Sequence, residues 1–206
     1  MRLVIASNNK GKIAEMSDLL ADLGVEIISQ REAGFNEDVD ETGTTFMENA
    51  RLKAAAASRA LGCAVIADDS GLMVDHLGGA PGVYSARYAG EGCVYDDNNT
   101  KLLGELEGVP FEERTAKFVT VITLIYPGPE GAPKTAKEQD GRCILVAKGE
   151  CHGHIAEEKL GSGGFGYDPV FIPDGYKNSF AQLGTDFKNT ISHRANAIAE
   201  LERLLG

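Results

Sequence analysis

Hydrophobic runs and helical patterns alternate at the start of the chain. Leu3 to Ala6 is a short apolar run that predicts a buried strand. Apolar residues then recur at three- and four-residue spacing from Ile13 to Leu23, and Gly24 supplies a stop, so this segment predicts a helix. Val25 to Ser29 predicts a second strand. The chain is therefore expected to begin with a strand, a helix and another strand.

A second helix is predicted after a polar, acidic loop over residues 32–43. Thr45 and Glu48 have the spacing of a capping box. In this motif the Thr45 side chain accepts from the amide of Glu48, and the Glu48 side chain reaches back to the amide of Thr45. The helix is expected to run to Gly62. Its alanine-rich face would let the helix lie close against a sheet.

The run from Cys63 to Ala67 predicts a strand that ends abruptly at Asp68, Asp69, Ser70 and Gly71. Taken alone, these four residues are typical of a polar turn. If the strand instead continues, the two aspartates point to opposite faces, and one of them can project into a cleft. A carboxylate in such a place could hold a magnesium ion or activate a water molecule.

The second half of the chain predicts further strands and helices. Residues 77–90 contain several glycines and Pro81, which favours a tightly folded loop. Asp96 to Leu106 predicts a short helix. Phe118 to Tyr126 and Cys143 to Ala147 predict antiparallel strands joined by an exposed loop. A final helix is expected after Ser192, with Ala195, Ile198, Leu201 and Leu205 on its buried face.

Size and charge limit the classes of protein that need to be considered. A chain of 206 residues can bury one substantial core, as a single domain or as two lobes that share a sheet. The net charge of -11 argues against a general nucleic-acid surface, which needs an excess of Lys and Arg. A single nucleotide remains possible, because it needs only a few well-placed cations.

The cysteines and the amino terminus indicate a cellular compartment. The four cysteines form no Cys-x-x-Cys pair, so reduced thiols in a cytosolic protein are the simplest interpretation. The first residues lack the apolar length of a signal peptide, and no stretch approaches membrane-spanning length. The sequence therefore predicts a cytoplasmic protein with no membrane partner.

The loop after the first strand is a candidate anion site. It contains Ser7, Asn8, Asn9, Lys10, Gly11 and Lys12, and it leads directly into a helix. Free amides and the helix dipole at such a position favour a phosphate group. The spacing is not that of a Walker loop. The alternative is that Asn and Ser only cap the helix.

A second unusual stretch, residues 160–169, surrounds Phe165 with glycines. An exposed Phe165 would be a stacking platform for a planar ring, whereas a buried Phe165 would only fill the core. Further along, Lys188, His193 and Arg194 gather near the start of the last helix. Cations there oppose the helix dipole, so a bound anion would explain them.

Two histidines, His152 and His154, share a face if their segment is extended. Without a carboxylate ligand nearby, such a pair is more often a surface feature than a metal site. The remaining candidate residues together indicate one site. Carboxylates at Glu41, Asp68 and Asp69, a phosphate-type loop and an aromatic platform describe a site for a nucleoside polyphosphate with magnesium.

Six motifs in this chain resemble those of the inosine triphosphate pyrophosphatase family, in that family's order and over nearly the whole length. They are Ser7-x-Asn9-x-x-Lys12, Glu41-Thr-Gly-x-Thr-Phe46-x-Glu-Asn-Ala, Ala67-Asp-Asp-Ser-Gly-Leu72, Gly78-Gly-Ala-Pro-Gly-x-Tyr-Ser-Ala-Arg87-Tyr, Gly163-Gly-Phe-Gly-Tyr-Asp-Pro169 and Ser192-His-Arg194. Six linked motifs are far more specific than any one of them, and the bacterial members are the closer match.

The resemblance implies a homodimeric, Mg²⁺-dependent enzyme. Its members hydrolyse the deaminated purine nucleoside triphosphates ITP, dITP and XTP to the monophosphate and pyrophosphate. The implied fold is α/β, an elongated mixed β-sheet flanked by helices. It would be one domain over residues 1–206, with two lobes and the active-site cleft between them.

The resemblance also assigns roles to individual residues. Asp69 would be the catalytic base and, with Glu41, a metal ligand. The phosphates would contact Ser7, Asn9, Lys12 and Lys53. Further candidates for substrate binding are Asn8, Lys10, Gly11 and Ser70. The purine base would be surrounded by Phe165, Gly166, Tyr167, Asp168, Lys188, His193 and Arg194. Arg87 has no firm role. Asn8 departs from the family, where glycine is frequent, although Asn tolerates a positive φ better than most residues.

Two other classes of function stay open at this level. A nucleotide-binding sensor would keep the phosphate loop and Phe165 but would not need Asp69. A general nucleotide phosphohydrolase would release orthophosphate in place of pyrophosphate.

Overall fold

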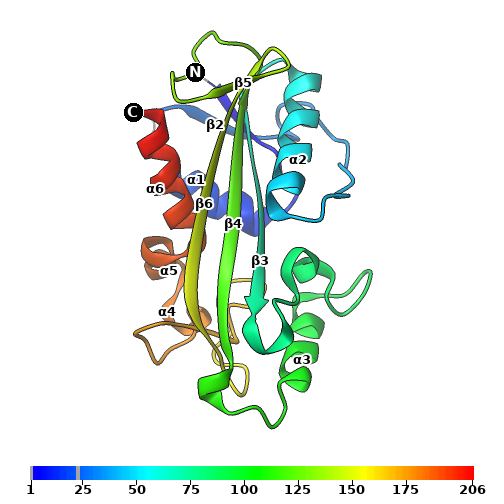
Figure 1. The fold of residues 1–206 in the computed structure, drawn as a ribbon, viewed down its shortest axis with the longest axis vertical. Coiled ribbons are helices and arrows are strands. Elements are labelled where there is room, and N and C mark those ends of the chain that lie inside the picture. Colours follow the sequence, from blue (N-terminus) through cyan, green and yellow to red (C-terminus); the bar gives the residue numbers. More distant parts are fainter. Residues whose placement is uncertain (1, 22–23) are drawn as a thin grey trace. The chain divides into compact units, whose positions relative to one another are not determined.

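The computed structural model describes residues 2–21 and 24–206 and contains a seven-stranded sheet (Figure 1). The strand order is β2-β1-β3-β4-β6-β5, and β7 pairs with β6 off this path. The strands are β1 Arg2–Ile5, β2 Glu26–Ser29, β3 Val65–Val74, β4 Thr115–Tyr126, β5 Lys137–Gln139, β6 Arg142–Ile155 and β7 Phe171–Pro173.

The helices are α1 Lys10–Leu19, α2 Phe46–Leu61, α3 Tyr95–Glu105, α4 Phe180–Leu183, α5 Thr185–Ile191 and α6 His193–Leu205. Four of the helices, α1, α2, α3 and α6, occur where the sequence predicts them, whereas the short helices α4 and α5 were not predicted. The capping box of α2 is confirmed, because Thr45 accepts from the amide of Glu48 and the Glu48 side chain reaches back. Leu23, the last apolar position predicted for the first helix, lies outside the described residues.

The chain divides into two compact units. Unit 1 contains residues up to Asp69, Thr120–Gly149 and Arg194–Gly206, and unit 2 contains Ser70–Val119 and Glu150–His193. Since strands β3, β4 and β6 each contribute residues to both units, the units share these strands.

Unit 1 has apolar residues on both faces of its parallel strands. Strand β1 pairs in parallel with β2 and β3, and its side chains alternate. Leu3 and Ile5 pack with α1 and α6, whereas Val4 and Ala6 pack with α2. Figure 1 shows α1 and α6 on one side of these strands and α2 on the other. Helix packing on both faces explains why the parallel strands read as continuous hydrophobic runs.

Unit 2 is built around an aromatic core. The Phe118 ring lies 4.7 Å from that of Phe171 and 6.2 Å from that of Phe180. Helix α3 adds Leu102, and Leu106 follows directly after the helix; both are fully buried. The residues between β3 and α3 form short 3₁₀ segments, at Asp75–Leu77 and Gly82–Arg87, within the predicted loop.

Two strand predictions are corrected by the structure. Strand β3 does not stop at Ala67 but continues through the aspartates to Val74, because the buried carboxylates find charged partners on both faces. The loop over residues 127–141 contains an additional strand, β5, which pairs antiparallel with β6. Its three residues are all exposed, so no apolar alternation marks this strand in the sequence.

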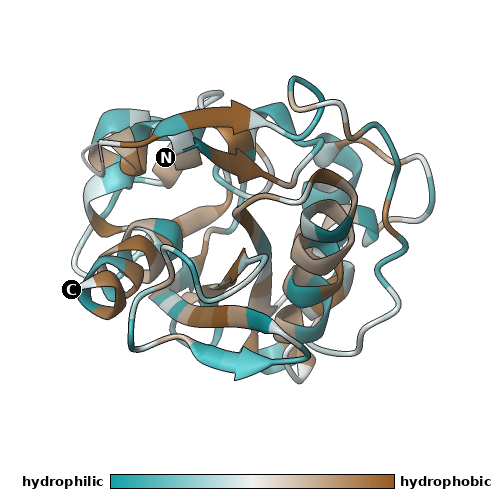
Figure 2. Cartoon of the chain, turned by 90° about the horizontal axis from the view of Figure 1, so that it is seen from above, coloured by the Kyte–Doolittle hydropathy of each residue, from teal (hydrophilic) through white to brown (hydrophobic). Residues whose placement is uncertain are grey.

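Hydrophobic and hydrophilic residues stripe the helices in the end-on view of Figure 2, as expected for helices that cover a sheet. Within residues 2–21 and 24–206, no helix combines the length and the apolar character that crossing a membrane requires.

Candidate functional site

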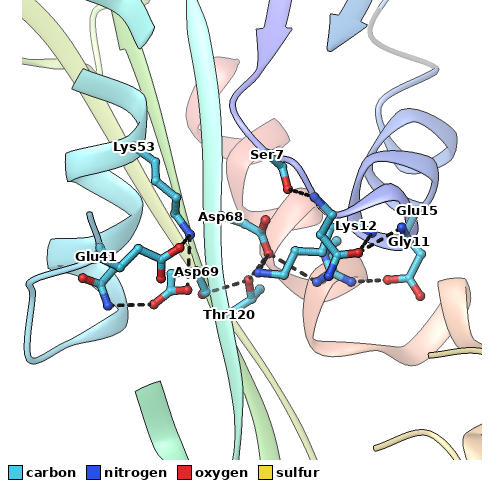
Figure 3. Close-up of polar contacts among 12 residues, drawn as sticks. Ser7, Gly11, Lys12, Glu15, Glu41, Lys53, Asp68, Asp69 and Thr120 are labelled. Atoms are coloured by element: carbon cyan, nitrogen blue, oxygen red, sulfur yellow. Dashed lines mark hydrogen bonds and ion pairs between the residues drawn. The ribbon is translucent and has the colours of Figure 1, made fainter. Parts of the chain in front are cut away.

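The two aspartates of β3 are the centre of the candidate site. Asp68 and Asp69 are 1% and 5% exposed, and successive side chains of a strand point to opposite faces. Figure 3 shows that Asp69 points toward Lys53 and Glu41, whereas Asp68 lies on the side of Lys12. The strand continuation thus separates two neighbouring carboxylates into two environments.

On the Asp69 side, one ammonium group joins two carboxylates. Lys53 Nζ lies 3.3 Å from Asp69 Oδ1 and 3.1 Å from Glu41 Oε1. Asn49 Nδ2 donates to Asp69 Oδ2 at 3.2 Å. Asn49 and Lys53 are four residues apart on α2, so they lie on one face of the helix. The capped α2 helix therefore orients two side chains toward Asp69, and the loop before it supplies Glu41.

Burial changes the acid-base properties of this group. It raises the pKa of Asp69 above its ordinary value, and the nearby ammonium groups of Lys53 and Lys12 only partly oppose this effect. Burial alone would lower the pKa of Lys53, but the carboxylates of Asp69, Asp68 and Glu41 outweigh it and raise that pKa. Lys53 therefore stays charged while Asp69 is a stronger base than an exposed aspartate.

On the opposite face, Asp68 holds two cations. Its Oδ2 lies 3.3 Å from Lys12 Nζ and 3.2 Å from Arg194 Nη2. The Arg194 guanidinium also donates through Nη1 to the buried Glu15 carboxylate. Arg194 is 1% exposed, so this chain of charges lies inside unit 1. Burial lowers the pKa of Lys12, although the Asp68 carboxylate works against this effect.

The loop before α1 is arranged around Asn9. The Asn9 Oδ1 accepts from the amides of Gly11 and Lys12 at 3.0 and 3.2 Å, and Ser7 Oγ accepts from the Asn9 amide at 3.2 Å. The capping role of Asn9 is therefore confirmed. Anion binding by this loop and by Lys10 stays a prediction. Among the described residues, Asp140 is the only non-glycine with a positive φ, so Asn8 needs no left-handed backbone here.

The aromatic stretch lies in unit 2, where Phe165 is half-buried. Lys188 Nζ lies over the ring, 4.6 Å from its centroid. The Asp168 carboxylate accepts from the Phe165 amide at 3.0 Å and from Lys188 Nζ at 2.8 Å. Phe165 is thus neither a fully exposed platform nor a core residue. Its backbone is held by Asp168, and a cation lies over its ring.

The three C-terminal candidates have different partners within their own units. Lys188 and His193 belong to unit 2, and Arg194 belongs to unit 1. His193 stacks on the Phe118 ring at 4.7 Å. Lys188 pairs with Asp168, and Arg194 pairs with Glu15 and Asp68, because buried charges need partners of opposite sign. Their nearness to the start of α6 therefore does not by itself indicate an anion.

The remaining candidates have ordinary surroundings. Ser70 is half-buried on β3, and the exposed Arg87 lies 5.2 Å from the centroid of the Tyr84 ring. His152 and His154 do have nearby carboxylates, Glu150 at 3.2 Å and Asp174 at 3.4 Å. Within the described residues, however, no group of three His, Cys, Asp or Glu side chains could hold a metal.

Several residues of the site give little signal in the sequence. Asn49 lies four residues before Lys53, which is the one spacing that could have indicated a shared helix face. In the sequence, Glu15 has the pattern of an ordinary helix surface residue, yet it accepts from Arg194. Thr120 has the pattern of an ordinary strand residue, yet its Oγ1 donates to the Asp69 carbonyl at 3.3 Å. Their roles depend on partners that are distant in sequence.

The fold and the site define an α/β protein whose buried carboxylates and ammonium groups flank one strand of an open sheet. Comparison with known proteins gives the family. The model of the Ham1 family matches residues 3–204, and the chain belongs to this family.

Similar proteins cover almost the whole chain. A dITP/XTP pyrophosphatase of Bacillus subtilis strain 168 is 46% identical over 202 residues, which is 98% of this chain and 96% of that protein. A Desulforamulus reducens protein with the same name is 48% identical over 206 residues, which is 100% of this chain and 96% of that protein.

Solved structures agree with this comparison. The Staphylococcus aureus Ham1 protein has a TM-score of 0.82 and 44% identity, and the match covers 100% of this chain and 98% of that one. A structure from Mycobacterium abscessus, described as a nucleoside-triphosphatase / dITP/XTP pyrophosphatase, has a TM-score of 0.73 and 39% identity, with 98% of each chain covered. The mixed sheet with flanking helices is therefore the fold of this family.

Proposed function

We propose that this chain hydrolyses deaminated purine nucleoside triphosphates, ITP, dITP and XTP, to the monophosphate and pyrophosphate. The names of the full-length relatives support this reaction class. The observation that carries the proposal is the arrangement of Asp69, a buried carboxylate with a raised pKa that shares Lys53 with Glu41. A sensor without turnover would not need a base at this position.

Magnesium is the cofactor that fits these residues. Mg²⁺ prefers oxygen ligands and is usually held by one or two carboxylates together with substrate phosphates. Glu41 and Asp69 offer two carboxylates that already converge on one cation, the ammonium of Lys53. When bound, the metal would supply positive charge to the phosphate oxygens. We therefore propose Glu41 and Asp69 as the metal ligands.

Asp69 is the proposed base for the attacking water. A general base works best when its pKa lies near the operating pH, and burial moves the pKa of Asp69 in that direction. Asn49 donates to one carboxylate oxygen of Asp69 and Lys53 contacts the other, so the carboxylate is fixed in orientation. The water would be directed at the α-phosphorus, which leads to pyrophosphate as the leaving group.

Positioning of the triphosphate is assigned to residues of unit 1. The loop from Ser7 to Lys12, with Lys53, would contact the phosphates through amides and ammonium groups. Ser70, the first residue of unit 2, is a further proposed substrate contact. Lys12 is held by Asp68 at 3.3 Å, so its position is fixed before substrate arrives. In phosphoryl transfer, positioning and charge stabilisation contribute more than covalent chemistry.

Recognition of the base is assigned to Phe165, Gly166, Tyr167, Asp168, Lys188, His193 and Arg194. Amide donors in this group would bind the 6-keto oxygen of a deaminated purine. ATP carries a 6-amino group, which would leave these donors unpaired. A site built to form such a bond can reject the wrong analogue by roughly 10⁴-fold.

Product analysis tests this function against its two alternatives. The pure protein is incubated with Mg²⁺ and with ITP, XTP, GTP or ATP, and the products are separated by chromatography. We expect IMP and pyrophosphate from ITP, with no turnover after chelation of the metal and recovery on adding Mg²⁺. Orthophosphate as the first product would favour a general phosphohydrolase. Binding of ITP without turnover would favour a sensor. Equal turnover of ATP would refute the proposed selectivity.

The proposal includes a homodimer in the cytoplasm, without nucleic-acid or membrane partners. All four cysteines are free thiols, which is consistent with a reducing compartment. Light scattering coupled to size-exclusion chromatography measures the mass in solution. A mass twice that of the 21.9 kDa chain is expected, and a mass of one chain would contradict the dimer.

A further inference from the structure

We infer that Asn99, on helix α3, is a positioning residue for the loop that carries Phe165, and that it acts through the carbonyl of Gly166. The inference rests on the proposed function, in which this loop recognises the purine base. Asn99 belongs to none of the six motifs that indicate the family, and nothing in its immediate sequence marks it for a role in the site.

The contact itself joins two distant parts of unit 2. Asn99 Nδ2 donates to the Gly166 carbonyl at 3.0 Å, across 67 positions in sequence. Asn99 is 2% exposed and Gly166 is half-buried, so the donor of this bond is shielded from bulk water. Because a carbonyl only accepts, the amide nitrogen must face Gly166, and the orientation of the Asn99 side chain is fixed.

Asn99 complements the restraint that Asp168 provides from within the loop. The Asp168 carboxylate holds the Phe165 amide and also Lys188, whose ammonium lies over the Phe165 ring. Gly166 has a φ of +64°, a conformation that glycine adopts readily, and its backbone alone would not hold the next peptide in one orientation. The Asn99 side chain supplies a restraint on Gly166 from outside the loop.

The other end of the Asn99 side chain argues against a purely structural role. Within the described residues, its Oδ1 is buried and has no hydrogen-bond partner. An unsatisfied buried acceptor opposes folding, and in native structures such groups are rare enough to need a reason. An apolar side chain of similar size would avoid this cost but could not hold the Gly166 carbonyl. Positioning of the loop supplies the reason.

The neighbouring residue Asn98 offers a matched control. It is also 2% exposed, but its side chain holds a different loop, accepting from the Ala89 amide at 2.7 Å and donating to the Ala86 carbonyl at 3.3 Å. An alanine at either position removes a buried amide from the same turn of α3. Only the Asn99 variant removes the restraint on the loop of Phe165.

The experiment compares Asn99→Leu, Asn99→Ala and Asn98→Ala with the parent. It measures kcat and KM for ITP, the dissociation constant of pyrophosphate by calorimetry, and the thermal midpoint. For both Asn99 variants we expect KM for ITP to rise about tenfold, the effect of losing roughly one hydrogen bond, with kcat changed less. Pyrophosphate should bind as in the parent. The midpoint of Asn99→Leu should fall less than that of Asn99→Ala, because leucine fills the space and removes the unsatisfied acceptor.

The outcomes separate this inference from the proposed function. If the parent does not hydrolyse ITP, the proposed function fails and the inference fails with it. If the parent is active, the inference alone is overturned by Asn99 variants that keep the parental KM. It is also overturned by equal loss of ITP and pyrophosphate binding, or by KM effects that Asn98→Ala reproduces. A fall in the midpoint of both Asn99 variants with unchanged KM would show a structural role only.

Discussion

The carboxylates of Asp68 and Asp69, adjacent in the chain, lie on opposite faces of strand β3 and bind different cations. Asp68 contacts Lys12 and Arg194, and Asp69 contacts Lys53. This separation gives two chemically similar side chains two roles. Asp68 holds a cation that would bind phosphate, whereas Asp69 has the raised pKa that suits a base.

Replacement of the two aspartates should therefore have unequal effects. We expect Asp69→Asn to lower kcat for ITP by about 10²- to 10⁴-fold, the range for removal of a general base. Asp68→Asn keeps the base, so its kcat for ITP should fall less than that of Asp69→Asn. Steady-state kinetics of both variants, with circular dichroism to verify folding, makes the comparison. Equal losses, or an Asp69→Asn protein as active as the parent, would contradict the assignment of the base.

The raised pKa of Asp69 predicts how activity depends on pH. A base must be deprotonated to accept a proton, so kcat/KM should rise with pH as Asp69 ionises. Burial raises this pKa, so the midpoint should lie above the ordinary value of 3.8. A kcat/KM profile at constant ionic strength measures it. A profile for the parent that is flat down to pH 3.8 would exclude Asp69 as the titrating base.

The same pKa shift predicts an effect on stability with the opposite dependence on pH. A carboxyl group whose pKa is raised in the folded state stabilises the fold below its unfolded pKa. This contribution is lost as pH rises through the folded pKa. The stability of Asp69→Asn relative to the parent should therefore increase as pH rises from acidic to neutral. Urea unfolding at several pH values tests this sign, and a relative stability that falls with pH would contradict it.

The buried pair of Lys188 and Asp168 should be sensitive to loss of either partner. Their side chains are 3% and 1% exposed, and their charged atoms lie 2.8 Å apart. Lys188→Met leaves the Asp168 carboxylate buried without this partner, so we expect a loss of about 3 kcal/mol in the free energy of unfolding. The double variant Asp168→Asn/Lys188→Met should recover part of it.

Urea unfolding of the single and double variants measures this coupling. Lys159→Met is a suitable control, because its ion pair with Asp96 involves a largely exposed carboxylate and should contribute little. Single variants of the buried pair that are as stable as this control would show that the ion pair does not hold the loop of Phe165.

Local signals explain which elements were predictable. The capping box at Thr45 and Glu48 marks the start of α2 because its hydrogen bonds connect residues three apart. The apolar periodicity before Gly24 similarly marks α1. By contrast, the polar residues after Ala67 favour a turn by their local preferences. They continue as a strand only because cations from α1, α2 and α6 compensate the buried charge.

The sequence by itself determined the four longer helices, the strand, helix and strand at the start of the chain and, through six motifs, the family. These features depend on short-range hydrogen bonds, on the periodicity of apolar residues and on the identity of side chains. Only the tertiary structure decided that Asp68 and Asp69 face opposite sides, that Arg194 is bound by carboxylates, and that Asn99 holds the loop of Phe165. Each of these depends on contacts between residues far apart in the chain, whose partners no local pattern specifies.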